Sequence, residues 1–325
     1  MGGHSKGDDP HASLDPGMRA FHEKLTAATP PGAENWPLEQ QRAAWNALCK
    51  SFQAPHPPGL AVSNIICNGV PCRFFRPEGE AVVPAVIYGH GGGWVLGGPD
   101  THDDMCAELV AHANVGVLLM DYRLAPEHPF PAQLEDSLKV WRWIAEIGAV
   151  HGLDPKNVIA AGDSAGGQMS VALAMALHEL GLPQVQALLL IYPVLGCDMN
   201  TPSYIRNANA PCLTRDEMGF YLRSFLGSGE SKAWSDAKAA PNLADDVSFF
   251  PPSFITVAAH DPLRDDGVIF RDKLQAAGVA VALREEPFLA HSYMRARNHS
   301  PPAKEGFDAI VKALKSLAWE GRLPE

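Results

Sequence analysis

From about residue 82 onward, the chain alternates short apolar runs with longer segments in which apolar residues recur every three or four positions. The short runs show no alternation with polar residues, so both faces of each predicted strand should be buried, as in a parallel sheet covered by helices. Six such strands are predicted, at residues 85–88, 115–120, 158–161, 187–191, 254–258 and 281–283. The pattern therefore predicts an α/β protein with a mostly parallel central sheet flanked by helices.

Two of the intervening segments have clear helical spacing. One carries Leu134, Leu138, Trp141 and Ala145 on a single face. The other runs from Met169 to Leu180 and is apolar on nearly all faces, so it should be buried almost all round. Gly181 and Pro183 signal its end.

The N-terminal segment does not fit the strand–helix alternation. Asp15 followed by Pro16 can begin a helix, and a second helix is expected near residues 45–52. The first helix would carry Met18, Phe21 and Leu25, and the second would carry Trp45, Leu48 and Phe52.

A second exception is the insertion at about residues 197–250, which separates two predicted strands. The sequence from Thr214 to Glu217 has the form of a capping box and predicts the start of a helix. An apolar helix away from the sheet crossovers indicates a lid over the carboxyl edge. An ordinary crossover helix with a long loop is the alternative. The helix would carry Met218, Tyr221, Leu222 and Phe225.

Composition narrows the function classes. The 325 residues are 46% hydrophobic and 19% charged, enough apolar material for one large core, and this excludes general disorder. The formal net charge of −11, with no basic run, argues against nucleic-acid binding. Six cysteines are scattered without a C-x-x-C pair, which favours reduced thiols over disulfides or a zinc site. No signal peptide or membrane span is visible, so a cytoplasmic protein is expected.

The strongest chemical signal is the G-x-S-x-G sequence at residues 162–166. Alone this motif is weak, but here it lies directly after a predicted strand and directly before the buried helix. That context is the one in which a sharp strand-to-helix turn exposes the serine hydroxyl. We therefore take Ser164 as the candidate nucleophile.

A second signal is the glycine run in residues 89–94, at the end of an earlier strand. A phosphate-binding loop is the rival interpretation, but Trp94 stands where its third glycine belongs and no Lys-Ser/Thr follows. Backbone N–H groups without side chains in the way can instead stabilise an oxyanion. The expected oxyanion hole consists of the N–H groups of Gly91, Gly92 and Ala165.

A nucleophilic serine needs a histidine base and an orienting acid, which in the α/β-hydrolase arrangement follow in the order acid, then histidine. Asp261 closely follows the strand at 254–258 and is the candidate acid, whereas Asp265 and Asp266 should cap the next helix. His291, beyond the last predicted strand, is the candidate base. His260 adjoins Asp261 and cannot easily meet its carboxylate. His299 should be a solvated loop residue.

Two other clusters of polar residues have a structural interpretation. His102 with Asp103 and Asp104 looks ligand-like, but no H-E-x-x-H sequence or clustered partner accompanies it, so no metal site is expected. In the proline-rich segment 121–132, Asp121, Arg123 and Glu127 should pair beneath the glycine loop.

Four segments in order now resemble the hormone-sensitive-lipase-like family of microbial esterases, within the α/β-hydrolase superfamily. The segments are HGGGW at 90–94, DYRLAPEHPFPA at 121–132, GDSAGG at 162–167 and DPLRDDG at 261–267. The similarity spans roughly residues 80–295. One departure is that Ser292 and Tyr293 follow His291, where the family usually has Gly and then an aromatic residue.

The resemblance implies an α/β-hydrolase domain over residues 1–325, with a helical cap from about residues 1–55 and 197–250. It implies a carboxylesterase that needs no cofactor and acts on a small ester of short or medium chain length, and it allows a homodimer. The expected pocket residues are Trp94, Met218, Tyr221 and Phe225. An amidase, arylformamidase-like enzyme or lactonase would use the same residues, and a non-catalytic small-molecule receptor is a further alternative.

Overall fold

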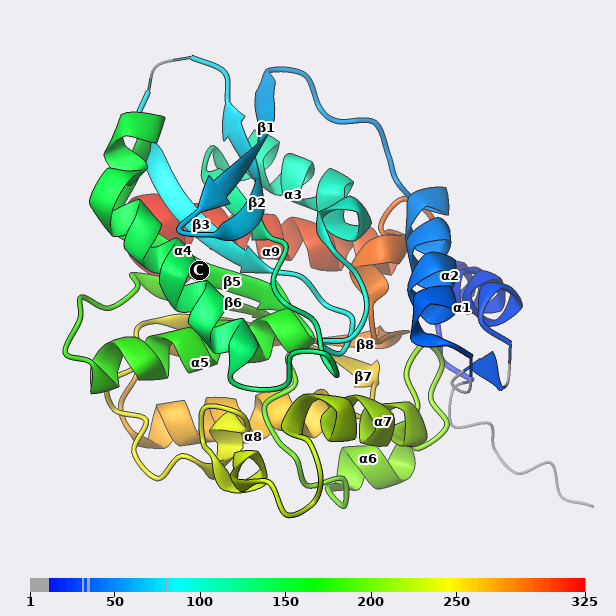
Figure 1. Cartoon of the computed structure of the whole chain (residues 1–325). Coiled ribbons are helices and arrows are strands. Elements are labelled where there is room, and N and C mark those ends of the chain that lie inside the picture. Colours follow the sequence, from blue (N-terminus) through cyan, green and yellow to red (C-terminus); the bar gives the residue numbers. More distant parts are fainter. Residues whose placement is uncertain (1–11, 31, 34–35, 80, 325) are drawn as a thin grey trace, which may run out of the picture.

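One eight-stranded sheet organises the chain, with the strand order β1-β2-β4-β3-β5-β6-β7-β8 (Figure 1). The computed structural model describes residues 12–30, 32–33, 36–79 and 81–324. Strands β3 to β8 are parallel, whereas β2 pairs antiparallel with both β1 and β4. The strands are β1 Leu60–Cys67, β2 Val70–Pro77, β3 Val83–Gly89, β4 Gly116–Met120, β5 Leu153–Asp163, β6 Ala187–Ile191, β7 Ser253–His260 and β8 Val281–Ala290.

The six predicted strands correspond to β3 to β8, and the α/β class is confirmed. Burial on both faces holds for β3, β4 and β6 but is wrong for β8, which is only partly buried. The reason is its position at the edge of the sheet, next to β7 alone. The β1–β2 hairpin was not among the predicted elements. Its turn residues Asn68 and Gly69 both have positive φ, and an Asn-Gly pair of this kind is a recognised hairpin signal.

Helices cover both faces of the sheet (Figure 1). On one face α3 packs against α9, and on the other α4 packs against α5, with α8 beside β7 and β8. As predicted, α5 is buried through most of its length. The helices are α1 Pro16–Ala28, α2 Leu38–Ser51, α3 Pro99–Ala113, α4 Ala132–Ile147, α5 Ala165–Glu179, α6 Pro202–Arg206, α7 Arg215–Leu226, α8 Arg264–Ala276 and α9 Pro301–Glu320.

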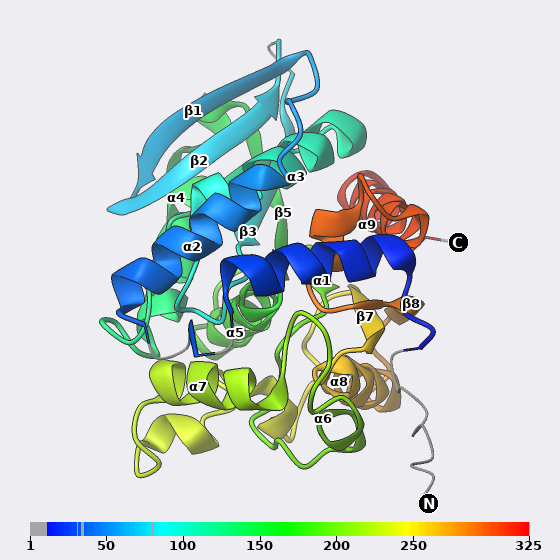
Figure 2. The ribbon, with the colours of Figure 1, turned by 90° about the vertical axis from the view of Figure 1, so that its right-hand side faces the viewer.

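Four helices outside the strand–helix alternation face one another in Figure 2, with α1 and α2 on one side and α6 and α7 on the other. The predicted helix starts are present: Asp15 accepts a hydrogen bond from the Met18 N–H, and Thr214 and Glu217 form the capping box of α7. These short-range signals could be read from sequence because each cap involves residues three positions apart. Residues 1–11 of the predicted cap lie outside the described residues.

The ion pairs around residues 121–132 differ from the prediction. Arg123 pairs with Glu135 and the buried Asp136 at the start of α4. Glu127 pairs instead with Arg42 of α2, in a two-point contact of 2.7 and 2.8 Å. The partners of Arg123 and Glu127 lie on α4 and α2, outside the segment 121–132. The predicted pairing of Asp121, Arg123 and Glu127 with one another was therefore wrong.

Candidate active site

Ser164 occupies the sharp turn between β5 and α5. Its φ of 54° and ψ of −117° are strained for a residue with a side chain, which costs of the order of 1–3 kcal/mol in general. Glycines make the turn possible, because a Cβ on Gly162 would lie 2.4 Å from backbone atoms of Gly166, and one on Gly166 would lie 1.8 Å from the Gly89 carbonyl oxygen. The turn therefore depends on close backbone contact between β3, β5 and α5.

The structure brings Ser164, His291 and Asp261 together at the carboxyl edge of the sheet. The His291 Nε2 lies 2.9 Å from the Ser164 hydroxyl oxygen, and its Nδ1 lies 2.7 Å from Oδ2 of Asp261. The second Asp261 oxygen accepts the Leu263 N–H at 2.9 Å. The serine hydroxyl can therefore donate to Nε2 while the Nδ1–H group donates to the buried carboxylate.

The rejected alternatives lie elsewhere. His260 is within hydrogen-bonding distance of Ser13, and His299 is exposed. Asp265 and Asp266 fall in the first turn of α8, but Leu263 is the N-cap residue, so the expectation that they cap this helix was wrong. Their carboxylates are already used, because Asp265 accepts the Ser203 N–H and Asp266 accepts the N–H groups of Leu195 and Gly196.

The glycine loop after β3 differs from the expectation at Gly91. Its N–H donates to Oδ1 of Asp163 at 3.1 Å, so this group is already engaged. Gly92 and Gly93 have φ values of 122° and 59°. Among the described residues, no acceptor bonds their N–H groups or that of Ala165. Gly93, not Gly91, therefore joins Gly92 and Ala165 as an available donor.

The glycine loop is bonded to a buried network of polar side chains centred on Asp163. Asp163 accepts from the Tyr88 hydroxyl at 3.1 Å and lies 3.3 Å from Nε2 of His102. Arg295 donates to the Thr101 carbonyl and lies 3.1 Å from the same His102 nitrogen. Burial alone would raise the pKa of Asp163, but His102 and Arg295 hold that pKa below its ordinary value.

The same network explains the ligand-like appearance of His102. Its ring is fully buried, and burial lowers its pKa despite the neighbouring Asp163. Within the described parts of the chain, no cluster of His, Cys, Asp or Glu side chains could hold a metal ion. Arg295 was not predicted as part of this network, and the one nearby signal in the sequence is the departure from the family pattern at Ser292 and Tyr293.

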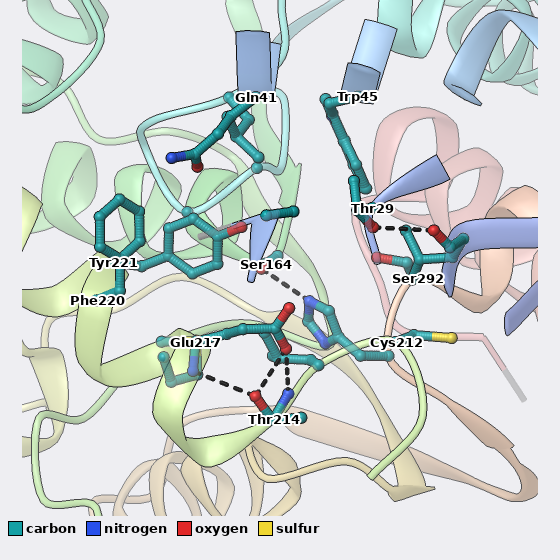
Figure 3. Close-up of a pocket in the computed structure, with 18 of the residues that line it drawn as sticks. Thr29, Gln41, Trp45, Ser164, Cys212, Thr214, Glu217, Phe220, Tyr221 and Ser292 are labelled. Atoms are coloured by element: carbon teal, nitrogen blue, oxygen red, sulfur yellow. Dashed lines mark hydrogen bonds between the residues drawn. The ribbon is translucent and has the colours of Figure 1, made fainter. Parts of the chain in front are cut away.

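A cavity of about 690 Å³ opens above Ser164 (Figure 3). Its walls come from α1, α2, the glycine loop, residues 210–223 and the segment after His291. Met218 and Tyr221 line it as expected, and the Tyr221 ring lies so near Gly93 that a Cβ there would approach it to 2.4 Å.

Trp94 and Phe225 do not line this cavity, contrary to expectation. Their rings stack with centroids 3.9 Å apart, and both side chains are fully buried. The indole N–H of Trp94 donates to Gln168 of α5 at 3.0 Å. The two rings therefore form the packing between the glycine loop and α7, behind the pocket wall.

The chain is similar to a known protein family and to characterised hydrolases. Residues 86–295 match the family described as an alpha/beta hydrolase fold. The chain is 41% identical over 249 residues to the carboxylesterase NlhH of Mycobacterium tuberculosis H37Rv, covering 76% of this chain and 78% of that protein. It is 33% identical over 252 residues to an ethyl acetate hydrolase of Pseudomonas putida, with the same two coverages.

Solved structures of esterases have a similar fold. A thermostable esterase from Pseudomonas putida ECU1011 superposes with a TM-score of 0.85 at 27% identity, covering 96% of this chain and 98% of that one. An ester hydrolase from the Lake Arreo metagenome, in complex with a phosphonate derivative, gives 0.86 at 29% identity, covering 93% and 98%. Of the helices in the described ranges, none is long and apolar enough to cross a membrane.

Proposed function

The chain belongs to the hormone-sensitive-lipase-like carboxylic ester hydrolases of the α/β-hydrolase superfamily, and from this premise we propose that Ser164, His291 and Asp261 are its catalytic triad. The observation that carries the proposal is the pair of contacts made by His291, at 2.9 Å to Ser164 and 2.7 Å to Asp261. Both are within the range that proton transfer requires.

In the first step, His291 removes the Ser164 proton as the serine oxygen attacks the ester carbonyl carbon. Asp261 orients the ring and stabilises the imidazolium that forms. The tetrahedral intermediate collapses when His291 gives the proton to the leaving alcohol, which leaves an acyl-enzyme. Water, activated by the same histidine, then attacks the acyl-enzyme, and the carboxylic acid is released.

The oxyanion is stabilised by backbone N–H groups of Gly92, Gly93 and Ala165. Ala165 is the first residue of α5, so the positive end of the helix dipole also faces the developing charge. Gly91 acts indirectly, since its bond to Asp163 fixes the loop that carries the other two glycines. Asp163 is thus a positioning residue for the oxyanion hole.

The substrates are esters of short to medium chain length. The cavity of about 690 Å³ has the size of a small-molecule site, and α1, α2 and α7 close it from the cap side. We assign the cap to about residues 1–55, of which the structure describes 12–30, 32–33 and 36–55, and to the insertion at about 197–250. The partly exposed edge strand β8, with Phe288 on its surface, is the place where a homodimer would form.

The test is hydrolysis of p-nitrophenyl esters from acetate to palmitate, with Ser164→Ala as the blank. Serine-dependent activity that is highest at short or medium chains supports the proposal. A rate rising steadily beyond about ten carbons would contradict the assigned chain length, and equal activity of Ser164→Ala would contradict the nucleophile. Parallel assays with a matched anilide and lactone separate ester hydrolysis from the amidase and lactonase alternatives.

A further inference from the structure

Two polar side chains from opposite sides of the cap line the active-site cavity: His22 of α1 and Glu217 of α7. The catalytic steps described above use neither residue. Their neighbours in the wall include the apolar side chains Leu25, Leu213 and Met218. Each of the two side chains is held at one atom by the protein and leaves another atom free.

The hydrogen bonding of His22 fixes its tautomer. Its Nδ1 accepts the backbone N–H of Cys212 at 3.2 Å, and because a backbone N–H can only donate, Nδ1 carries no proton. Burial lowers the pKa of His22, and Glu217 is the charged group that opposes this shift most strongly. The neutral ring must therefore carry its proton on Nε2, where no described residue accepts it.

Glu217 is fixed in a complementary way. Its Oε2 accepts from both the N–H and the hydroxyl of Thr214, at 2.7 and 2.8 Å. Figure 3 shows these bonds holding one side of the carboxylate. The other oxygen, Oε1, has no donor among the described residues and is available as an acceptor on the pocket side.

We propose that His22 and Glu217 form a polar subsite that binds a hydroxyl group carried by the acyl or alcohol part of the ester. This inference rests on the proposed esterase function and names the kind of ester the cavity prefers. A hydroxyl group uses both free atoms, because its oxygen accepts from the Nε2–H of His22 and its hydrogen is donated to Oε1 of Glu217.

Other polar groups fit less well. Arg223 and Arg295 also line the cavity, but a carboxylate placed at the two free atoms would be repelled by Glu217 and would offer no donor to its Oε1. An ammonium group would satisfy Glu217 but would leave the His22 N–H facing another donor. A plain alkyl chain would displace water from both groups without replacing its hydrogen bonds, which costs affinity.

The test compares matched esters that differ by one terminal hydroxyl group. On the acyl side the pairs are p-nitrophenyl hexanoate with 6-hydroxyhexanoate and octanoate with 8-hydroxyoctanoate. On the alcohol side the pair is butyl butyrate with 4-hydroxybutyl butyrate. For the chain as it stands, we expect kcat/KM to favour the hydroxylated member of at least one pair by roughly tenfold, as two hydrogen bonds would provide.

Two conservative variants remove the unbonded donor of His22 or the unbonded acceptor of Glu217, and keep the hydrogen bonds to Cys212 and Thr214. His22→Asn retains an acceptor for the Cys212 N–H but has no donor at the position of Nε2. Glu217→Gln retains the capping box, and because its oxygen must face Thr214, its amide NH2 replaces the free acceptor. Each should reduce the preference ratio to near one. Glu146→Gln, on the exposed end of α4 away from the cavity, removes the same charge and should keep the ratio.

The outcomes distinguish a failure of the esterase function from a failure of the hydroxyl subsite. If no ester is hydrolysed faster than by Ser164→Ala, the proposed function itself fails. If both members of every pair are hydrolysed at equal kcat/KM, or if the preference survives in both variants, the subsite is wrong and the esterase stands. Thermal unfolding of each variant identifies any loss that comes from misfolding, and the ratio within one variant is independent of its active fraction.

Discussion

The Gly91 N–H donates to the Asp163 carboxylate at 3.1 Å, which ties the glycine loop to the residue preceding Ser164. The same carboxylate oxygen accepts from the Tyr88 hydroxyl, and its other oxygen faces His102. Strand β5, which precedes the proposed nucleophile, and the glycine loop, which carries the proposed oxyanion donors, are therefore both held by the buried Asp163 carboxylate. Any change that releases this anion should move donors and nucleophile relative to each other.

Asp163→Ala tests this relationship. We expect kcat to fall by about 10²-fold with little change in KM, since the loss of one oxyanion donor has an effect of this size. Asp163→Asn keeps an oxygen for Gly91 and Tyr88 and should retain most activity. Steady-state kinetics on p-nitrophenyl butyrate distinguish the two variants. Equal losses in both would mean that the charge, not the hydrogen bond, controls the loop.

Asp261→Asn tests the orienting role of the acid. The Leu263 N–H needs the single amide oxygen as its acceptor, so the amide NH2 faces Nδ1 and donates to it. His291 then adopts the wrong tautomer, and kcat should fall by about 10⁴-fold. Ser164→Ala should lose about 10⁶-fold in comparison. Asp265→Asn is the control, because its carboxylate binds the Ser203 N–H instead of the histidine. A triad role for Asp261 is contradicted if both aspartate variants behave alike.

Arg42→Ala tests the connection between α2 and the glycine loop. Arg42 donates to the carbonyl oxygens of Val95 and Ala125 and pairs with Glu127. Its removal leaves two carbonyls without their donor and should destabilise the fold by about 1–3 kcal/mol. Glu127→Gln breaks only a pair whose carboxylate is 50% exposed, and should cost no more than about 1 kcal/mol. Denaturant unfolding of both variants measures the difference.

The features that could be predicted depend on residues near one another in the sequence, whereas the features that were missed depend on residues far apart in it. Ser164, Asp261 and His291 could be named because each directly follows a strand of a parallel sheet, whose carboxyl ends meet at one edge. The Gly91 bond could not be predicted, because its acceptor is Asp163, 72 residues later. Arg42 and Glu127 are likewise 85 residues apart. These partners become neighbours only after the helices are packed.

Trp94 and Phe225 show a second reason why parts of the site could not be predicted from sequence. Trp94 and Phe225 were expected in the pocket because of the resemblance to the esterase family. In the structure, Trp94 has a φ of 60°, and its side chain packs against Phe225 and Gln168. The direction of the side chain was set by backbone conformation, which the glycine run permits but does not specify.

The pKa of Asp266 predicts how stability depends on pH. Desolvation raises this pKa to about 7, although the N–H groups of Leu195 and Gly196 oppose the shift. The folded state therefore binds a proton more tightly than the unfolded state, whose aspartate titrates near its ordinary value of about 3.9. Between about pH 4 and pH 7 the folded state holds more protons, so this group's contribution to the free energy of unfolding decreases as pH rises.

Asp266→Asn isolates that contribution. The amide oxygen can still accept from Leu195 and Gly196, whereas the titration is gone. We expect the variant to gain stability relative to the unsubstituted chain as pH rises from about 4 to 7, and the difference to level off above pH 7. Urea unfolding at several pH values measures both proteins. A stability difference that stays constant across this range would show that Asp266 is ionised throughout, and that its two backbone bonds outweigh the cost of burying its charge.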